Sequence, residues 1–316
     1  MVRMPEAASP ESETAARVGV VTVSYGSGEA LEQFLASLRE HHGDAVAVAV
    51  ADNKPGEDGV ASLLAARFGA RYLPLPSNPG YGAGMNAGVR ALREARGATA
   101  AEPAAAAELG DAEEGFDAFF FCNPDVRFIE PAIGELATAL GGDPRAGSIG
   151  PRTLDDDGEV YPSARDIPSV GTGVGHALFG RVWPGNPWSK AYKHATDYDR
   201  RREAGWLSGA AVMVKSEVYD AVGGWDEAYF LHFEDIDLGY RIGLSGRTNV
   251  FEPAITVVHS GGHSLKKHSA IAERAMTESG IRFMSKRYSG PWRGPLRGAV
   301  VAGLRQRGAR ETRSSR

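Results

Sequence analysis

Residues 17–25 read RVGVVTVSY and residues 116–126 read FDAFFFCNPDV, and these two stretches decide the fold class. Each is a short apolar run, rich in β-branched or aromatic residues, that ends in polar or turn-forming residues. Runs of this kind are typical of strands that are buried on both faces of a sheet. AVAVAVADN at 45–53 and ARYLPLP at 70–76 have the same character, so the sequence predicts four buried strands.

Helix-forming stretches separate the four predicted strands. Residues 30–42 place apolar side chains at helical spacing, and residues 58–68 and 86–95 also predict helices. Alternation of strand and helix predicts an α/β fold with a Rossmann-like, mainly parallel central sheet flanked by helices. Ligands bind such sheets beyond the carboxyl ends of the strands, so polar residues there are the candidates for a site. Residues from about 148 to 260 predict an irregular continuation that completes the site, and residues 270–287 predict a C-terminal helix.

The composition is that of a globular protein. The 316 residues are 42% hydrophobic and 24% charged, which excludes a collagen-like or wholly disordered chain. Cys122 is the only cysteine, so a disulfide framework is excluded. No apolar run approaches the roughly 18–20 residues that a membrane helix needs. Residues 1–16 predict a disordered leader without an apolar signal core, so export is not expected, and the Ala/Glu-rich residues 97–115 predict a surface insertion.

Charge is divided unevenly along the chain. The net charge of −5 hides ten Lys/Arg and one acid, Glu311, between residues 282 and 316, a segment that carries +9. The rest of the chain then carries −14. The acidic body argues against nucleic-acid binding. The basic end favours contact with an anionic membrane surface, and the alternative is a solvated tail.

Polar residues follow the first two predicted strands. Ser24 and Tyr25 end the first, and Asp52 and Asn53 end the second. An Asp at such a position is able to accept hydrogen bonds from a ribose hydroxyl or a base imide. The alternative is an ordinary helix cap or turn, which Asp and Asn also favour.

The segment SNPGYGAGMNAG, at 77–88, precedes or opens a helix. Its glycines would let backbone N–H groups approach a phosphate at the positive end of that helix. The segment lacks the GKS or GKT of a Walker loop, and it does not follow the first strand as a dinucleotide fingerprint does. A turn alone would explain two of the glycines.

Two short motifs suggest a metal site. CNPDV, at 122–126, would expose Asp125 at the carboxyl edge of the sheet, where a carboxylate is able to hold a divalent cation bridging a diphosphate. His259 follows a short apolar strand and precedes two glycines, which suits a metal ligand or a phosphate contact. The alternatives are an Asn-Pro-Asp turn and a structural histidine.

A cluster of acids in FLHFEDIDLGYRI, at 230–242, suggests a general base. Glu234, Asp235 and Asp237 lie within four positions, beside aromatic residues. A carboxylate in a partly apolar pocket is able to act as a general base. The alternative is an acidic helix start. The sequence contains no GxSxG, HExxH or CxxC motif.

In chain order, these blocks resemble the inverting glycosyltransferases of family 2, which have the GT-A fold. The resemblance includes WLSGAAVMVKSEVYD, which begins at Trp206, and covers about residues 18–290. Within the family, the chain is most similar to bacterial rhamnosyltransferases. The resemblance implies a catalytic domain at 17–290, with a basic, membrane-contacting tail at 291–316.

The resemblance also implies roles for individual residues. Asn123-Pro124-Asp125 matches the Asp-x-Asp-type metal motif of the family with Asn in the first position, which leaves Asp125 as the principal carboxylate ligand. His259 would be the second ligand to Mg²⁺ or Mn²⁺, and Asp235 would be the base, with Glu234 as its rival. The implied donor-binding residues are Ser24, Tyr25, Asp52, Asn78, Gly80, Asn86 and Asn123, and the implied acceptor-binding residues are Trp206, Gly209 and Ala210.

The implied reaction is the transfer of L-rhamnose from dTDP-L-rhamnose to GlcNAc-diphospho-polyprenol, in synthesis of the arabinogalactan linker of a cell wall. The implied location is cytoplasmic, peripheral at the inner face of the plasma membrane. One alternative is a family 2 transferase that uses a UDP-hexose donor. Another is a non-catalytic nucleotide-sugar-binding protein. The sequence leaves a homo-oligomer open.

Overall fold

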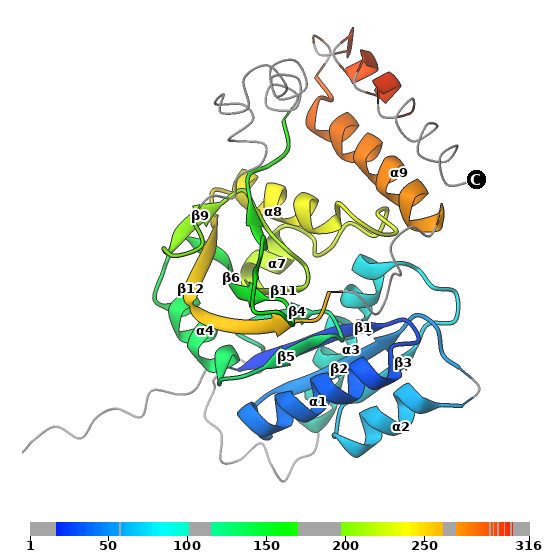
Figure 1. Ribbon diagram of the computed structural model, residues 1–316, viewed down its shortest axis with the longest axis vertical. Coiled ribbons are helices and arrows are strands. Elements are labelled where there is room, and N and C mark those ends of the chain that lie inside the picture. The colour runs from blue at the N-terminus through cyan, green and yellow to red at the C-terminus, as the bar shows by residue number, and fades with distance from the viewer. Residues whose placement is uncertain are drawn as a thin grey trace, which may run out of the picture.

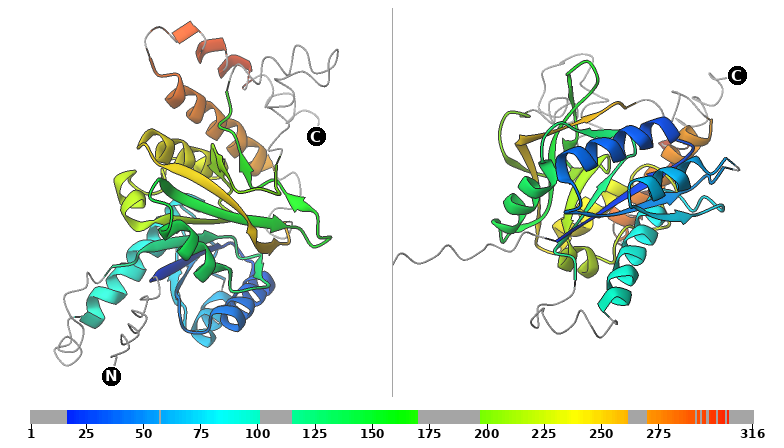
Figure 2. Two further views of the ribbon diagram at one scale, coloured as in Figure 1. Left: turned by 90° about the vertical axis from the view of Figure 1, so that its left-hand side faces the viewer. Right: turned by 90° about the horizontal axis from the view of Figure 1, so that it is seen from below.

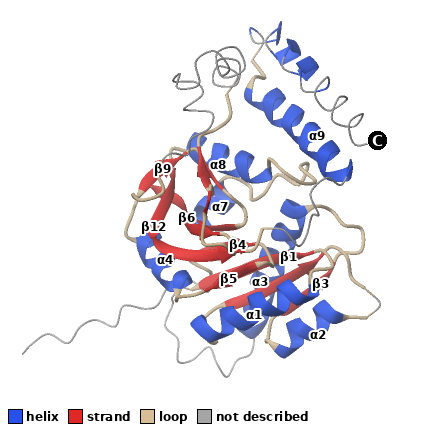
Figure 3. Ribbon diagram, in the orientation of Figure 1, coloured by secondary structure: helices blue, strands red, loops and turns tan. Residues whose placement is uncertain are grey.

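A computed structural model describes residues 17–56, 58–100, 115–169, 197–261 and 270–290, together with scattered positions between 292 and 305. The described residues form a ten-stranded mixed sheet that is covered by helices on both faces (Figure 1, Figure 3). The strand order along its main path is β3-β2-β1-β4-β11-β6-β12-β5. The α/β prediction is therefore confirmed.

The N-terminal half alternates strand and helix as the sequence predicts. Strands β1, β2, β3 and β4 are parallel to one another, and Ser24 at the end of β1 pairs in register with Asp52 at the end of β2. The elements of this half are β1 (Val18–Ser24), α1 (Gly28–His42), β2 (Ala47–Asp52), α2 (Val60–Arg67), β3 (Arg71–Pro74), α3 (Tyr81–Ala100) and β4 (Ala118–Cys122).

The C-terminal half extends the sheet with shorter strands. Strand β11 is antiparallel to both β4 and β6, whereas β12 is parallel to β6. Strands β8 and β10 form a separate two-stranded sheet. The elements of this half are β5 (Val126–Phe128), α4 (Ala132–Gly141), β6 (Ala146–Leu154), β7 (Val160–Tyr161), β8 (Ala164–Arg165), β9 (Arg202–Ala204), β10 (Trp206–Leu207), β11 (Ala211–Lys215), α7 (Ser216–Ala221), α8 (Glu234–Leu244), β12 (Thr248–His259) and α9 (Ala270–Arg287).

Alternation of side chains in the central strands divides the core into two layers. In β4, Phe120 faces the layer that contains α1 and α4, whereas Phe119 and Phe121 face the layer that contains α3, α7 and α8. All three phenylalanines are fully buried. Because both faces are covered, β4 is apolar throughout, and the polar residues that follow it are left at the edge of the sheet.

Helix α3 begins at Tyr81, five residues earlier than predicted, so most of the glycine-rich segment is helical. A Cβ atom on Gly88 would lie 2.3 Å from Val21, and one on Gly84 would lie 2.8 Å from Val23. These glycines let α3 approach β1 closely. Close packing of the helix on the sheet therefore explains Gly84 and Gly88, in place of the phosphate loop that the sequence suggested.

The predicted C-terminal helix is present as α9, which lies beside α8 and far from α1 and α2 (Figure 2). Its Phe283 is fully buried in a small apolar cluster with Trp206, Tyr229 and Ile236. Lys286 forms ion pairs with Asp226 and Asp237 in the body of the protein. Part of the positive charge that the sequence assigns to the end of the chain is thus neutralised within the fold.

Some predicted segments lie outside the described residues. These are the leader 1–16, residues 101–114 of the insertion predicted at 97–115, and most of the tail 291–316. Residues 97–100 belong to α3. Among the described residues, no helix is long and apolar enough to cross a membrane.

The packing of α3 generates a stability prediction. Gly88→Ala is expected to lower the free energy of unfolding by about 1–3 kcal/mol, because its methyl group would overlap Val21. Gly97→Ala is the matched control, since it lies in the same helix with nothing within 4 Å of its added Cβ. The control is expected to raise stability by about 0.5–1 kcal/mol, the difference in helix propensity. Denaturant unfolding measures both, and equal effects would contradict the packing argument.

Candidate active site

The ends of β1 and β2 bring the first group of predicted residues together. Ser24 and Asp52 are buried neighbours, and the N–H of Asn53 donates to the carbonyl of Ser24 at 2.8 Å. The Asp52 carboxylate accepts hydrogen bonds from the hydroxyl of Tyr72 at 3.0 Å and from the N–H of Lys54 at 3.1 Å. Burial and the bond to Asp52 raise the pKa of Tyr72 to about 12.

Tyr25 is the exposed member of this group. Its side chain is half-exposed, and the ammonium group of Lys54 lies 5.3 Å from its ring centroid. Asn78 lies in the β3–α3 connection with a left-handed φ of 45°. Asn53, at the end of the second predicted strand, has no role assigned from the sequence. Its side-chain amide donates to the carbonyl of Gly80 at 3.0 Å, which holds the β3–α3 connection against the end of β2.

Asn123, Asp125 and His259 meet at the end of β4, as the metal-site prediction requires. His259 pairs with Val126 in the β12–β5 register, which sets it beside Asp125. The distance from His259 Nε2 to Asp125 Oδ1 is 3.2 Å, and the distance to Asn123 Nδ2 is 3.1 Å. Asp125 and His259 are both buried.

This donor set fits a divalent cation. Asp125 Oδ1 is buried and accepts no hydrogen bond from the described residues. A buried, unpaired carboxylate oxygen is costly, and a cation shared with His259 would remove that cost. Within the described ranges, no three His, Cys, Asp or Glu residues gather at one metal site. That result agrees with the Asn-Pro-Asp motif at 123–125, which supplies a single carboxylate.

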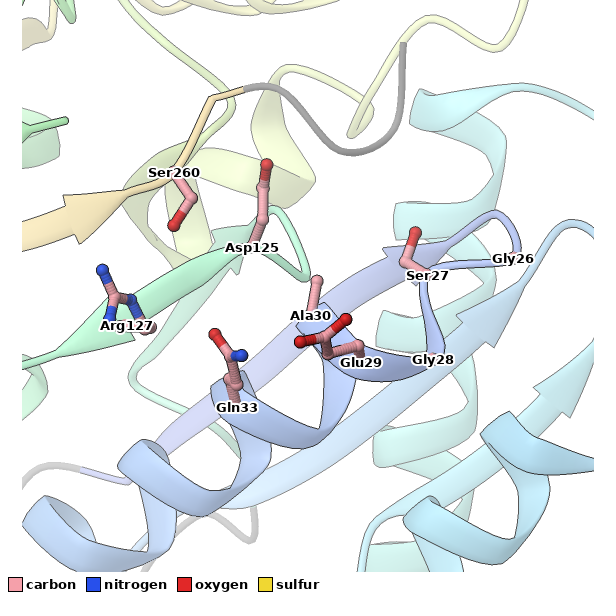
Figure 4. Close-up of a pocket in the computed structure, with 9 residues that line it drawn as sticks. All are labelled: Gly26, Ser27, Gly28, Glu29, Ala30, Gln33, Asp125, Arg127 and Ser260. Carbon is pink, nitrogen blue, oxygen red and sulfur yellow. The ribbon is translucent and has the colours of Figure 1, made fainter. Parts of the chain in front are cut away.

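A cavity of about 220 Å³ opens beside Asp125, between the start of α1, the start of β5 and the end of β12 (Figure 4). The first turn of α1 forms one wall, and a helix N-terminus favours negative charge. The residues that line the cavity are Gly26, Ser27, Gly28, Glu29, Ala30, Gln33, Asp125, Arg127 and Ser260.

A turn before β11 connects the metal pair to the acidic cluster. The carbonyl of Ala210 accepts a hydrogen bond from the N–H of Asn123 at 3.0 Å. The N–H of Gly209 donates to Asp235 Oδ2 at 3.2 Å, and its carbonyl accepts from the hydroxyl of Tyr81 at 2.7 Å. Tyr81 lies in the quoted glycine-rich segment, but no residue pattern there identifies it as a partner of this turn.

The three acids of α8 have different surroundings. Burial raises the pKa of Asp235 to about 6, although hydrogen bonds from the N–H groups of Gly209 and Ile236 favour its charged form. Burial and the neighbouring Asp235 raise the pKa of Glu234 well above its ordinary value, and its Oε2 has no hydrogen-bond partner among the described residues. Its surroundings therefore favour the protonated form of Glu234.

Asp237 is fully buried and forms ion pairs with Arg241 at 2.6 Å and Lys286 at 2.7 Å. These cations come from α8 and α9, so Asp237 joins the two helices. Because two cations of the protein already neutralise its charge, Asp237 is not a candidate for the general base.

Trp206 is buried at the other end of the same turn. Its indole N–H donates to the carbonyl of Asp166 at 3.1 Å, and its ring belongs to the apolar cluster that includes Phe283. Trp206, Gly209 and Ala210 thus lie on one short segment that passes the Asp235 carboxylate.

Asn86 and Gly80 have structural contacts. The Asn86 carboxamide bonds to the hydroxyl of Tyr219, to both backbone polar groups of Trp225 and to Glu227, which uses its full hydrogen-bonding capacity. Gly80 has a φ of 99°, and a Cβ atom there would lie 2.4 Å from the carbonyl oxygen of Phe230. We therefore propose that both residues position the α3 start against the 225–230 segment rather than contact a donor directly.

Comparisons with known proteins identify relatives of this chain. No family model matches the chain. The chain is 39% identical over 299 residues to N-acetylglucosaminyl-diphospho-decaprenol L-rhamnosyltransferase of Mycobacterium tuberculosis, which covers 94% of this chain and 93% of that protein.

Two solved structures have a similar fold. A mannosyltransferase from Pyrobaculum calidifontis in complex with GDP-Man and Mn²⁺ has a TM-score of 0.56 at 13% identity, covering 99% of this chain and 79% of that one. GalNAc-T7 with UDP, GalNAc and Mn²⁺ has a TM-score of 0.56 at 12% identity, covering 94% of this chain and 55% of that one. The fold and the family together define a GT-A glycosyltransferase. More particularly, the chain belongs to the same rhamnosyltransferase family as the mycobacterial enzyme.

The geometry of Asp125 and His259 generates a prediction about metal binding. Asp125→Asn is expected to weaken Mn²⁺ binding to the isolated protein at least tenfold, because it removes the charged ligand of the buried pair. Titration calorimetry with Mn²⁺, with and without dTDP, measures the change. Asp44→Asn is the control, since its exposed carboxylate pairs with Arg39 of α1 and contacts neither ligand. Unchanged Mn²⁺ affinity in Asp125→Asn would contradict the assignment.

Proposed function

We propose that this protein transfers L-rhamnose from dTDP-L-rhamnose to an N-acetylglucosamine that is linked through diphosphate to a polyprenol, the reaction that begins the arabinogalactan linker of a cell wall. The observation that carries the proposal is the 39% identity, over 94% of the chain, with a mycobacterial enzyme named for that sugar and that acceptor. The arrangement of acids around the Gly209 turn supports a single displacement.

Asp235 is the residue that we assign as general base. Its carboxylate takes the proton of the acceptor hydroxyl, and the oxygen forms a bond to the anomeric carbon of the donor sugar. The bond from that carbon to the diphosphate oxygen breaks, and the nucleoside diphosphate leaves with the electron pair. Because attack and departure occur on opposite faces, the configuration inverts. The backbone N–H groups that bond to Asp235 favour its charged form, whereas Glu234 has an unpaired oxygen and a pKa raised well above its ordinary value; this supports Asp235 over its neighbour.

Asp125 and His259 would hold Mg²⁺ or Mn²⁺. When bound, the cation would neutralise the negative charge that develops on the leaving diphosphate. Asn123 Nδ2 lies 3.1 Å from His259 Nε2 and would hold the imidazole beside Asp125 until the cation takes that nitrogen. The cavity at the start of α1 is lined by Glu29 and Asp125 as well as Arg127, so an anionic donor group would enter it together with the cation.

The donor nucleoside is assigned to the ends of β1 and β2. Ser24, Tyr25 and Asp52 line this edge, and Asn78 lies in the connection that follows β3. Tyr25 offers a half-exposed aromatic face, which suits stacking against a base. Trp206, Gly209 and Ala210 are assigned to the acceptor side because their segment passes Asp235.

The chain is proposed to act in the cytoplasm, at the inner face of the plasma membrane, because a polyprenol acceptor lies in a bilayer. Residues 291–316 contain seven arginines and one acid. Trp292, at the start of this segment, is 95% exposed. An exposed tryptophan among arginines is suited to the interface of an anionic membrane.

Vesicle sedimentation tests the membrane contact. The full-length protein is expected to bind vesicles with anionic lipids more strongly than a 1–290 truncation, and added salt is expected to weaken the binding. Neutral vesicles are the control. Equal binding of both proteins to anionic vesicles would contradict a role for the tail.

A transfer assay tests the proposed function itself. Purified protein is incubated with Mn²⁺, a GlcNAc-diphospho-prenol and each of dTDP-L-rhamnose, UDP-glucose, UDP-galactose and UDP-GlcNAc. Transfer is expected from dTDP-L-rhamnose in preference to the UDP-sugars. Transfer from a UDP-hexose alone would contradict the rhamnosyl assignment.

The same assay tests the base. Asp235→Asn is expected to lower kcat by about 100- to 10,000-fold while leaving donor affinity unchanged. Wild-type activity is expected to rise with pH through about 6, because Asp235 accepts a proton only when it is ionised. Glu234→Gln, which mimics a neutral acid, is the matched variant and is expected to retain activity. A larger loss in Glu234→Gln than in Asp235→Asn would reverse the two roles.

A further inference from the structure

Arg165 is an exposed cation on the acceptor side of the site that the functional assignments leave unused. It belongs to β8 and pairs in register with Trp206 of β10. Its guanidinium lies 5.8 Å from the Trp206 ring, and its Nε donates to the carbonyl of Pro162 at 2.8 Å. Among the described residues, no carboxylate lies within ion-pair distance of Arg165, whereas Arg201 contacts two carboxylates and Arg241 contacts one.

Trp206 provides a rigid support for this guanidinium. The indole N–H is bonded to the carbonyl of Asp166, and its ring is buried against the apolar cluster. The chain at 166–167 lies directly on Gly205, where a Cβ atom would be 2.3 Å from the N atom of Ile167. The contacts with Trp206 and Pro162 leave the two terminal amino groups of Arg165 free of protein partners in the described part of the chain. A pre-oriented guanidinium of this kind binds phosphate at a low cost in conformational entropy.

The position of Arg165 relative to Asp235 suits an acceptor group. Trp206 lies three residues before Gly209, whose N–H binds the Asp235 carboxylate, so the two ends of this segment are about 10 Å apart at most. The positive charge of Arg165 is also among the influences that oppose the rise in the pKa of Asp235. Arg165 therefore lies near the base, displaced from it along β10.

The same segment continues towards α9. Arg287 of α9 donates to the carbonyl of Pro168 at 2.8 Å, three residues beyond Arg165. The segment 165–168 thus leads from the vicinity of Asp235 to the helix that precedes the basic tail. A lipid-linked acceptor has the same order of parts: the sugar, then the diphosphate, then the lipid.

We propose that Arg165, supported by Trp206, binds a phosphate of the acceptor's diphosphate and thereby selects acceptor sugars that carry this group. The inference rests on the proposed function, because the diphosphate-linked acceptor is part of that proposal. One sugar ring separates the attacking hydroxyl at Asp235 from the phosphate at Arg165. The planar guanidinium donates paired N–H groups to phosphate oxygens.

The test compares two acceptors that differ only in the phosphate groups. Wild-type protein and Arg165→Gln are assayed with GlcNAc-diphospho-prenol and with a GlcNAc alkyl glycoside that lacks phosphate, at saturating donor. Arg165→Gln is expected to raise the KM for the diphosphate acceptor about 10- to 100-fold, the effect of losing a charge-assisted hydrogen bond. The KM for the phosphate-free acceptor and the affinity for dTDP are expected to stay unchanged.

Two further variants give the experiment its controls. Arg165→Lys keeps the charge but lacks the planar fork, and is expected to recover part of the lost affinity. Arg67→Gln removes an exposed arginine of α2 that pairs with Glu32 of α1, and it is expected to leave both KM values unchanged. Equal losses with both acceptors in Arg165→Gln would show a structural role and overturn the inference. If the wild-type protein transferred no sugar to the diphosphate acceptor, the result would instead contradict the proposed function. The phosphate ligand proposed for Arg165 would then be contradicted as well.

Discussion

The antiparallel pairing of β11 with β4 is the interaction on which the site depends. It joins Cys122 at the end of β4 to Ala211 at the start of β11, and the bond from Asn123 N–H to the Ala210 carbonyl continues the pairing by one step. The metal motif after β4 and the turn before β11 are therefore adjacent. Gly209, one residue further back, then reaches Asp235. A shift in this register would separate Asp125 and His259 from Asp235.

Environment, more than residue type, distinguishes the acids of the site. Asp235 accepts hydrogen bonds from two backbone N–H groups, and burial raises its pKa to about 6. A carboxylate with this pKa is suited to act as a base near neutral pH. Glu234 is buried without a hydrogen-bond partner for one oxygen among the described residues, and its pKa is raised well above its ordinary value. Asp237 is neutralised by Arg241 and Lys286. Three acids within four positions thus have three environments: Asp235 is the candidate base, Glu234 favours its protonated form, and Asp237 links α8 to α9.

Prediction from sequence succeeded where the pattern is local. The apolar runs that end at Ser24, Asp52 and Cys122 identify buried strands by themselves, and the order of the elements indicates a parallel sheet. Prediction went wrong at the start of α3. Gly84 and Gly88 resemble a phosphate loop in sequence, but the atoms that explain them belong to Val23 and Val21, some sixty residues earlier in the chain. No local pattern reveals such a contact.

The sequence alone determined the α/β class, the strand-end position of Asp125 and the presence of an acidic helix start at Glu234, because hydrophobic period and residue type are properties of short segments. Only the tertiary structure decided that Asp125 and His259, 134 positions apart, lie 3.2 Å from each other. It also decided how the environments of the three α8 acids differ, and that Arg165 lies beside Trp206 without a carboxylate partner among the described residues. Burial and pairing depend on neighbours that the fold brings from distant parts of the chain, so they follow from packing and not from the order of residues.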